Sequence, residues 1–369
     1  MIPALDLIRQ YQAHKSEIAE AVFGVLESGK YINGPKVAAF EEAMAQYVGT
    51  GQAVALNSGT DALYLALRAL DVGPGDEVVT TPFTFAATTE TIVAAGATPV
   101  FADIDPVTFD LDPGGIEVAI TSRTKAILPV HLYGLPADMP RILAIADRHG
   151  LAVIEDCAQA IGAEIDGKRV GSIGTIGCFS FFPTKNLGAF GDGGMITTGD
   201  NALAKRIRKL RAHGAASKYY HEEVGVNSRL DEIQAAILLI KLGHIEEWIL
   251  RRRQLAHAYD RLLGDLCDIQ VPAAPRSVRH VYHQYTIRVF RQRDAVRESL
   301  GHRGVASTVY YPTPLHLQPV HAQLGLKRGA YPEAERAAQE VLSLPIFPEM
   351  RDDELQAVAA ALKDATVAT

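Results

Sequence analysis

Short apolar runs alternate with longer stretches of helical periodicity between residues 53 and 212 of this chain. The apolar runs are too short for helices and are bounded by turn-forming residues, which favours strands. The predicted strands cover residues 53–56, 77–80, 98–101, 126–130, 152–155, 176–182 and 194–197. Helices are predicted between them near residues 60–70, 86–95, 114–120, 138–149 and 201–212. Because strands joined through helices run in one direction, the pattern predicts an α/β fold with a mostly parallel, seven-stranded sheet covered on both faces.

Helical patterns also precede and follow the alternating segment. Before it, helices are predicted at about 14–28 and 36–47, with a loop rich in Gly and Pro between them. After it, apolar positions from Leu230 to Trp248 form one helical stripe, which continues to about residue 262. The remainder of the chain predicts a smaller α+β unit, with a strand at 283–290 and helices at 293–300, 331–342 and 352–364.

The length of 369 residues exceeds what one ordinary hydrophobic core holds. We therefore expect a large domain over residues 1–245, which includes the N-terminal helical segment, and a small C-terminal domain over residues 246–369. The long helix at about 230–262 would join them. In a sheet of this kind, ligands bind at the carboxyl ends of the strands. Functional side chains are therefore sought at those ends.

The overall composition narrows the class of protein. A formal net charge of -7, with 48% apolar and 21% charged residues, is typical of a globular protein and argues against a nucleic-acid partner. The basic residues 251–253 lie in a helical pattern that also contains acidic residues, so we interpret them as a solvated helix face. The three cysteines are widely spaced and form no metal-binding pattern, and no signal peptide or membrane span is apparent. The sequence predicts a cytoplasmic protein without a metal site or a membrane partner.

Lys185 lies between an apolar run and a glycine-rich turn. Burial lowers the pKa of a lysine, and the neutral amine is then a nucleophile for a carbonyl carbon, as Schiff-base chemistry requires. Ser180, five residues earlier, offers a hydroxyl for an anionic group of a cofactor. Taken alone, Lys185 is more often a surface lysine on a loop after a strand, so its neighbours must decide.

Asp156 follows the predicted strand 152–155 and places a carboxylate at the mouth of the sheet. An aspartate in this position can pair with a protonated ring nitrogen and so keep a pyridine cofactor electron-withdrawing. Gln159, three residues on, can donate a hydrogen bond to a ring oxygen. The alternative is an aspartate that only caps a helix.

Two further segments offer contacts to a phosphorylated aromatic cofactor. Gly59 and Thr60 open a helix directly after the strand 53–56, where free N–H groups and the helix dipole favour a phosphate. Simple capping of the helix explains the same residues. Phe85 follows the strand 77–80 and can stack on a ring face, although a core phenylalanine is the usual outcome.

Other motifs are weaker or exclude a function. The glycines at 171, 174 and 177 have the wrong spacing for a dinucleotide-binding fingerprint. Neither a P-loop nor a G-x-S-x-G motif is present in the sequence. The segment 131–134 either faces the substrate or forms a turn, and Tyr31 either contacts a ligand or belongs to a plain loop between helices.

Taken in order, these motifs resemble the DegT/DnrJ/EryC1/StrS family of sugar aminotransferases. The resemblance runs from about Asp6 to Phe347 and rests on segments 31–35, 58–63, 155–159, 180–185 and 227–236. It implies an aspartate-aminotransferase-type fold (fold type I). It also implies a homodimer whose active sites are shared between subunits.

The resemblance implies a role for each motif residue, with pyridoxal 5'-phosphate as the cofactor. Lys185 is similar to the lysine that carries the cofactor, and Asp156 to the partner of the pyridine nitrogen. Gln159 corresponds to the ligand of the ring oxygen and Phe85 to the stacking aromatic. The residues that resemble phosphate ligands are Gly59, Thr60, Ser180 and, from the other subunit, Asn227. Candidate contacts for the sugar or its diphosphate, each of which is equally an interface or surface residue, are Tyr31, Lys218, Arg229, Tyr310, Tyr311 and His316.

The implied reaction is transamination of a nucleotide-linked keto-sugar, with an amino-acid donor such as glutamate. Lysine at position 185 favours transamination, since the sugar dehydratases of the family have histidine there. Segments 131–134 and 311–318 resemble members that aminate C3 of the sugar. Two alternatives stay open: an aminotransferase of the same fold for a ketone without a nucleotide, and a non-catalytic regulator that binds the cofactor or a sugar nucleotide. Lys185 and Asp156 argue against the regulator, which does not need both.

Overall fold

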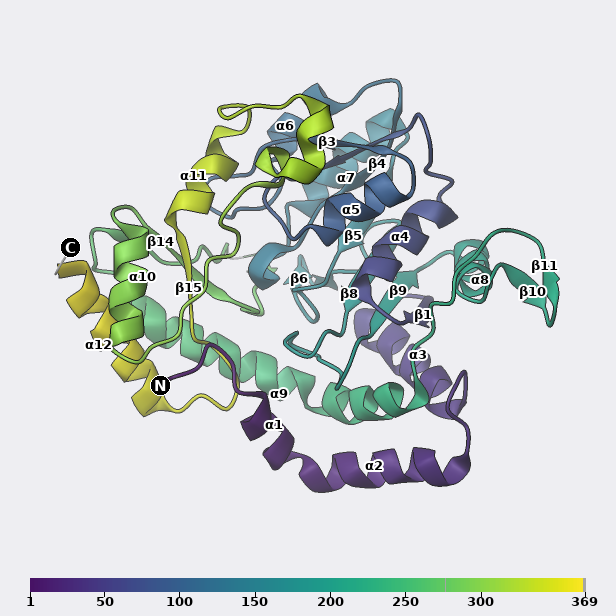
Figure 1. Ribbon diagram of the computed structural model, residues 1–369, viewed down its shortest axis with the longest axis horizontal. Helices are drawn as coiled ribbons and strands as arrows, with labels where there is room; N and C mark the ends of the chain where they lie inside the picture. The colour runs from purple at the N-terminus through teal and green to yellow at the C-terminus, as the bar shows by residue number, and fades with distance from the viewer. Residues whose placement is uncertain (276, 368–369) are drawn as a thin grey trace.

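A seven-stranded sheet lies at the centre of the computed structural model, which describes residues 1–275 and 277–367 (Figure 1). Its strands, in the order in which they lie side by side, are β1 (Gln52–Leu56), β9 (Gly194–Thr198), β8 (Ile176–Ser180), β5 (Ala152–Asp156), β4 (Thr124–Leu128), β2 (Glu77–Thr80) and β3 (Thr98–Phe101). The neighbours from β8 to β3 pair in parallel, whereas β9 is antiparallel to both β1 and β8. The predicted α/β fold with a mostly parallel sheet is confirmed.

Helices cover both faces of this sheet, because its strands are apolar on both sides. Along β1, Val54 and Leu56 belong to one buried cluster, whereas Ala53 and Ala55 belong to a cluster on the opposite face. Such double burial explains why the strands read as continuous apolar runs. The helices that follow the strands are α4 (Gly59–Ala69), α5 (Ala87–Ala94), α6 (Pro113–Ala119), α7 (Met139–His149) and α8 (Asn201–Leu210).

Three helices precede the sheet, where the sequence predicted two. They are α1 (Leu7–Ala13), α2 (Lys15–Ser28) and α3 (Pro35–Val48), and His14 separates the first two with a backbone that leaves the helical region. The long helix α9 (Glu232–Leu263) packs against α2 and α3. In its second half, Leu255 and Tyr259 belong to the core of the C-terminal unit. One helix therefore contributes to both cores.

The C-terminal unit has its own apolar core around a three-stranded sheet. Its elements are β12 (Ile269–Gln270), β14 (Tyr285–Val289), β15 (Val341–Leu344), α10 (Arg293–His302) and α12 (Asp352–Val367). The helix α11 (Pro332–Glu340) precedes β15 but buries Ala334 and Ala337 in a core of the large sheet. The predicted helix at 331–342 is wrong at its end, because residues 341–344 form β15 and pair antiparallel with β14. A domain boundary at residue 245 stays a prediction, since Trp248 and Ile249 still pack in the core of the large sheet.

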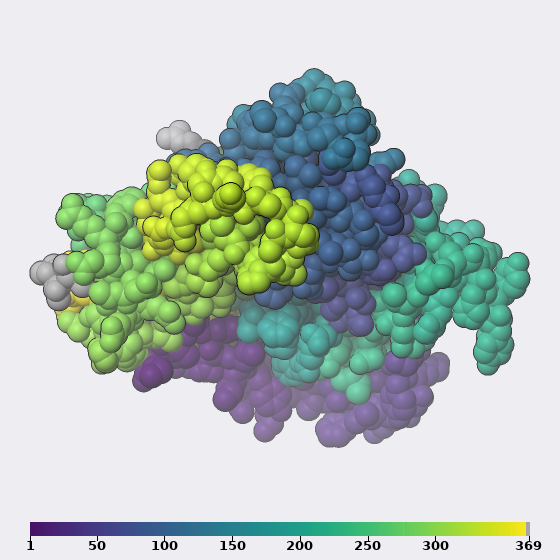
Figure 2. All heavy atoms as spheres, turned by 45° about the horizontal axis from the view of Figure 1, so that its top comes forward, coloured from purple at the N-terminus to yellow at the C-terminus, as the bar shows by residue number. Residues whose placement is uncertain are grey.

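Several short elements complete the fold. A hairpin of β10 (Ala215–Ser217) and β11 (Tyr220–His221) projects away from the body of the molecule, as both views show (Figures 1 and 2). A small sheet consists of β6 (Glu164–Ile165), β7 (Lys168–Arg169) and β13 (Val278–Arg279). Short 3-10 turns occur at Leu132–Gly134, Leu315–Leu317 and Pro319–Leu324. Within the described residues, every helix is too short or too polar to cross a membrane.

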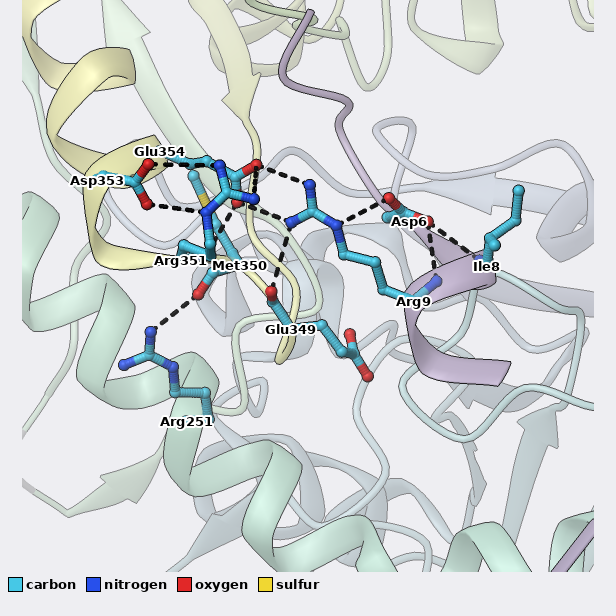
Figure 3. Close-up of polar contacts among 9 residues, drawn as sticks. All are labelled: Asp6, Ile8, Arg9, Arg251, Glu349, Met350, Arg351, Asp353 and Glu354. Carbon is cyan, nitrogen blue, oxygen red and sulfur yellow. Dashed lines mark hydrogen bonds and ion pairs between the residues drawn. The ribbon is translucent and has the colours of Figure 1, made fainter. Parts of the chain in front are cut away.

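The N-terminal segment is fixed to the C-terminal unit at two places. The amide of Ile2 donates to the carbonyl of Gly304 at 2.7 Å. Arg9 in α1 makes a two-pronged pair with Glu354 in α12, with both N–O distances at 2.8 Å (Figure 3). Asp6 caps α1 and also pairs with Arg9. The intervening residues Ala4 and Leu5 are thereby held against the wall of the cavity described next.

Candidate active site

A cavity of about 810 Å³ lies at the carboxyl edge of the large sheet, bounded by the C-terminal unit and the N-terminal segment. The ends of β1, β2, β5 and β8 all contribute to its wall, as expected for a parallel sheet. The predicted site residues that line it are Gly59, Thr60, Phe85, Asp156, Gln159, Ser180, Lys185, Tyr310 and Tyr311. Residues far apart in the sequence are thus collected in one place.

Asp156 is the last residue of β5 and is buried at the base of the cavity. Its Oδ1 accepts the amide of Ala158 at 3.1 Å, and its Oδ2 accepts the hydroxyl of Thr88 at 3.1 Å. Burial raises the pKa of this carboxyl group, while the Ala158 amide, the Lys185 charge and the Thr88 hydroxyl counteract that rise. Each oxygen keeps a free lone pair, so the carboxylate can accept a further charged donor from the cavity.

Lys185 follows β8 in a tight turn, in which its amide donates to the carbonyl of Phe182 at 2.8 Å. A few residues later the chain returns to the sheet, where the amide of Ala189 donates to the carbonyl of Phe181. The turn directs Lys185 into the cavity. Burial lowers the pKa of its ammonium group and Asp156 opposes that effect. A larger fraction of the Lys185 side chain is therefore in the neutral amine form than for a lysine in water.

The N-terminus of α4 faces the same cavity through Gly59 and Thr60. Ser58 caps the helix by accepting the amide of Asp61 at 3.0 Å. As the first residues of a helix, Gly59 and Thr60 have amides without an intrahelical acceptor, and none is found for them elsewhere in the described chain. Two unpaired amides at the positive end of a helix form a site for a phosphate.

Glycines let this helix end approach the sheet closely. A Cβ atom on Gly59 would lie 2.6 Å from the Cβ of Ser180. A Cβ atom on Gly194, the first residue of β9, would lie 2.1 Å from the carbonyl oxygen of Ser58. The hydroxyl of Ser180 is consequently held beside the helix N-terminus, where it adds a third donor for an anion.

Gln159 and the aromatic residues form the opposite part of the wall. The Oε1 of Gln159 accepts the amide of Tyr133 at 2.7 Å, and its Nε2 donates to the hydroxyl of Tyr311 at 3.2 Å. Phe85 is 59% exposed and its ring lies 6.3 Å from that of Tyr311, whereas the nearby Phe83 is fully buried. Phe85 is therefore no core residue, and it presents a ring face at the cavity.

The other predicted contacts do not line this cavity. His316 is buried and its Nε2 lies 3.0 Å from a carboxylate oxygen of Glu335, so in this chain it belongs to an internal pair. Tyr31 is half exposed and its hydroxyl donates to the carbonyl of Leu26. Asn227 is exposed, and Arg229 lies nearby on the same strand-like segment. Contacts from these residues to a ligand stay predictions.

The first residue of the segment 131–134, His131, makes hydrogen bonds inside the protein. His131 is fully buried, and its Nδ1 accepts the amide of Ala137 at 3.0 Å. Its Nε2 must then carry the proton and donate to Glu155, 3.1 Å away. The ring fixes the turn behind the cavity and does not face a substrate.

Three residues that the sequence interpretation overlooked also belong to the site. Thr88 contacts Asp156, and His283 and Arg252 line the cavity beside Lys185. The prediction that 251–253 form a solvated helix face is wrong for Arg252, which is buried. Its position on the inner side of α9 is visible only once the C-terminal unit covers it.

A parallel sheet with a lysine, a buried carboxylate and a helix N-terminus around one cavity defines an enzyme of the aspartate-aminotransferase structural class (fold type I). Sequence comparison is more specific. Residues 12–363 match the model of the DegT/DnrJ/EryC1/StrS aminotransferase family, and the chain belongs to this family. The resemblance noted from the motifs is confirmed.

Two relatives span almost the full chain. A pleiotropic regulatory protein of Geobacillus stearothermophilus is 52% identical over 97% of this chain and 96% of its own length. A UDP-N-acetyl-3-dehydro-alpha-D-glucosamine 3-aminotransferase of Acidithiobacillus ferrooxidans is 49% identical over 98% of this chain and 97% of its own length.

Two solved structures have the same fold. The crystal structure of DesV from S. venezuelae, in complex with a ketimine intermediate, superposes with a TM-score of 0.96 at 46% identity and covers 98% of both chains. The structure of NtdA from Bacillus subtilis, with bound cofactor PMP, gives a TM-score of 0.92 at 35% identity over 99% of this chain and 85% of that chain.

Proposed function

We propose that this aminotransferase uses pyridoxal 5'-phosphate to transfer an amino group from an amino acid to a nucleotide-linked keto-sugar. The observation that supports the chemistry is that the half-buried Lys185, whose pKa is lowered by burial, shares one cavity with the buried carboxylate of Asp156. The names of the relatives support the substrate class, since one is a UDP-N-acetyl-3-dehydro-alpha-D-glucosamine 3-aminotransferase and another, from Streptomyces venezuelae, is a dTDP-3-amino-3,4,6-trideoxy-alpha-D-glucose transaminase.

The residues around the cavity fit the chemical groups of the cofactor. The free amides of Gly59 and Thr60, with the Ser180 hydroxyl, would hold the phosphate. The open lone pairs of Asp156 would accept the pyridinium N–H, and Phe85 would cover one ring face. Bound pyridoxal phosphate supplies an imine-forming aldehyde and a ring that withdraws electrons from the adjacent carbon.

Lys185 has two tasks in this proposal. Its amine holds the cofactor until an amino-acid donor replaces it. The released amine would then act as a general base for the Cα proton of the donor and as a general acid that returns this proton at C4'. Burial lowers the pKa of Lys185 and so favours the neutral amine that accepts the proton. The reverse sequence transfers nitrogen to the keto-sugar, so the kinetics would be ping-pong.

Several finer points belong to the same proposal. Glutamate would be the donor and C3 of the sugar the aminated carbon, the latter supported by the relative that acts at position 3. The protein would work as a homodimer in the cytoplasm. Asn227 and the projecting hairpin at Ala215–His221 are exposed and would then reach the second active site, while Tyr31 and Arg229 would serve the sugar side.

Absorbance spectroscopy tests the chemistry directly. Purified protein loaded with pyridoxal phosphate should absorb visible light and lose that absorbance when L-glutamate is added. Lys185→Ala should abolish turnover and keep the melting temperature, whereas Lys168→Ala, an exposed lysine in β7, should behave as the wild type. A protein that binds no pyridoxal phosphate would refute the proposal. Mass spectrometry of the products from a panel of keto-sugar nucleotides would identify the substrate.

A regulatory function is the second candidate, because one relative is named a pleiotropic regulatory protein. A regulator that only binds the cofactor or a sugar nucleotide would not convert any keto-sugar nucleotide of the panel. Conversion of one of them by the purified wild-type protein would exclude this alternative.

A further inference from the structure

Arg252 in α9 is an unusual arginine, because it is only 3% exposed and yet lines the cavity. Its Nη1 donates to the carbonyl oxygens of Ile346 at 2.9 Å, Tyr282 at 3.1 Å and His283 at 3.4 Å. Its Nε is buried without any partner, and no acceptor is found for Nη2 in the described part of the chain. Half of the guanidinium is thus saturated and the other half is free.

The free half has the geometry of a carboxylate receptor. Nε and Nη2 carry N–H groups that point the same way from one edge of the planar guanidinium, which is the edge that binds both oxygens of a carboxylate. The three carbonyls hold the opposite side of the group, so its orientation is fixed before a ligand arrives. A fixed receptor loses little side-chain entropy on binding.

The charge of Arg252 also lacks a full counterion. Carbonyl oxygens are neutral, and the described residues offer no ion pair for this guanidinium. Glu349 is the acidic group whose charge acts on it, but burial raises the pKa of Glu349 and one of its oxygens has no partner. Burial lowers the pKa of Arg252 to about 10, which still leaves it protonated at neutral pH. A buried cation of this kind favours an anionic ligand.

Contacts place Arg252 on the lysine side of the cavity. His283, whose carbonyl accepts from Arg252, has its Nδ1 3.2 Å from the Oδ1 of Asn186, the residue next to Lys185. Burial, followed by the charges of Lys185 and Arg252, lowers the pKa of His283, so this ring is neutral. The phosphate-binding amides belong to a different wall, at the N-terminus of α4. An anion bound at Arg252 would therefore lie apart from the phosphate and on the side of Lys185, where the substrate reacts.

We propose that Arg252 binds the α-carboxylate of the amino donor through Nε and Nη2. This inference rests on the proposed aminotransferase function. The carboxylate is attached to the carbon that loses its proton, so an arginine beside Lys185 would orient the donor with that carbon toward the lysine amine. The residue would then select α-amino acids as donors over simple amines.

The test compares ligands that differ only at this carboxylate. Protein loaded with pyridoxal phosphate is titrated with α-methyl-L-glutamate and with α-methyl-L-isoglutamine, in which an amide replaces the α-carboxylate; neither ligand has a Cα proton, so both report binding alone. The spectral change of the bound cofactor gives both affinities. Wild type should bind the donors that carry the α-carboxylate about 10- to 100-fold more tightly, since a charged hydrogen-bonded pair contributes about 1.5–3 kcal/mol. Equal affinities of the wild type for the two kinds of ligand would overturn the proposal.

Arg252→Lys should remove most of this preference, while Arg251→Lys, on the same helix, should keep it. Arg251 is the matched control because it donates to the Met350 carbonyl (Figure 3). It also pairs with Asp352, and it does not line the cavity. An Arg252→Lys protein that keeps the full preference would refute the inference. If that variant does not fold, the wild-type comparison still decides. If the wild type binds no pyridoxal phosphate at all, the proposed function fails instead, so the two failures are distinguishable.

Discussion

Gly194 is a sharp test of how the phosphate site is built. The residue begins β9 between Leu56 of β1 and Ser180 of β8, and its missing side chain makes room for the N-terminus of α4. In Gly194→Ala, the added Cβ would lie 2.1 Å from the Ser58 carbonyl oxygen and 2.7 Å from the Gly59 nitrogen. Ordinary contacts begin at 3.4 Å, so the helix end must retreat by 3.4 minus 2.1, or about 1.3 Å.

Both stability and cofactor affinity should respond to this displacement. Overpacking of a buried position costs about 1–3 kcal/mol. With an unfolding entropy of about 2.1 cal/mol/K per residue over 369 residues, that cost lowers the melting temperature by about 1–4 °C. A shift of 1.3 Å would also break the charge-assisted hydrogen bonds to the phosphate, of which one contributes about 1.5–3 kcal/mol. The affinity for pyridoxal phosphate should fall about 10- to 100-fold.

Titration of the cofactor-free protein with pyridoxal phosphate and with pyridoxal separates the two effects. Gly194→Ala should weaken binding of the phosphorylated compound and leave the affinity for pyridoxal nearly unchanged. Gly199→Ala is the matched control, because a Cβ at this position, just beyond β9, would have no atom within 4 Å. Two results would show that the helix N-terminus is not the phosphate site. In one, Gly194→Ala binds pyridoxal phosphate as tightly as Gly199→Ala does; in the other, its affinity for pyridoxal falls by the same factor as its affinity for pyridoxal phosphate.

Two further predictions concern charged groups. Asp156→Asn keeps an acceptor for Ala158 and a donor for Thr88 but removes the charge, so it should fold normally and slow transamination at least about 10- to 100-fold in single-turnover measurements; an unchanged rate would exclude Asp156 as the ring partner. The hydrogen bond from Arg9 holds the pKa of Glu354 at about 2, below the value of an unfolded chain, so its stabilising effect is complete above pH ~4.5 and is lost as the pH falls toward 2. The melting temperature of Glu354→Gln should lie below that of the wild type at neutral pH, and the gap should close in acid; a gap that does not depend on pH would contradict this origin.

The large sheet was predictable because most of its strand residues are buried, and strands such as β9 are buried on both faces, so the apolar run itself marks the strand. β15 was not predictable in the same way. Residues 331–344 continue a helical pattern, and only the pairing of Ile287 with Leu342 and its neighbours in β14 turns the last four residues into a strand. Tertiary contacts of this kind override local propensity.

The residues of the site likewise differ in whether the local sequence or only the tertiary structure reveals them. Asp156 and Lys185 follow predicted strands and Ser180 lies near the end of one, so the topology of a mostly parallel sheet brings them to one edge. Arg252 stands between two other arginines on a helix, and nothing in that local pattern distinguishes the buried one. His316 had a motif in its favour, but the structure pairs it with Glu335 inside the protein. Burial of a charged side chain depends on what covers it, which a local sequence pattern does not show.

The antiparallel strand β9 has a consequence for how the protein is made. β1 reaches the sheet only through β9, so Gln52 must wait for Thr198 before it has a partner. Such a long loop closure slows folding and leaves β1 without a neighbour during synthesis. The N-terminus of α4, which follows β1, therefore has nothing to pack against until β8 and β9 have been synthesised. Cofactor capture would then report completed assembly of the sheet, and nascent chains that end before β9 should be unable to recruit it.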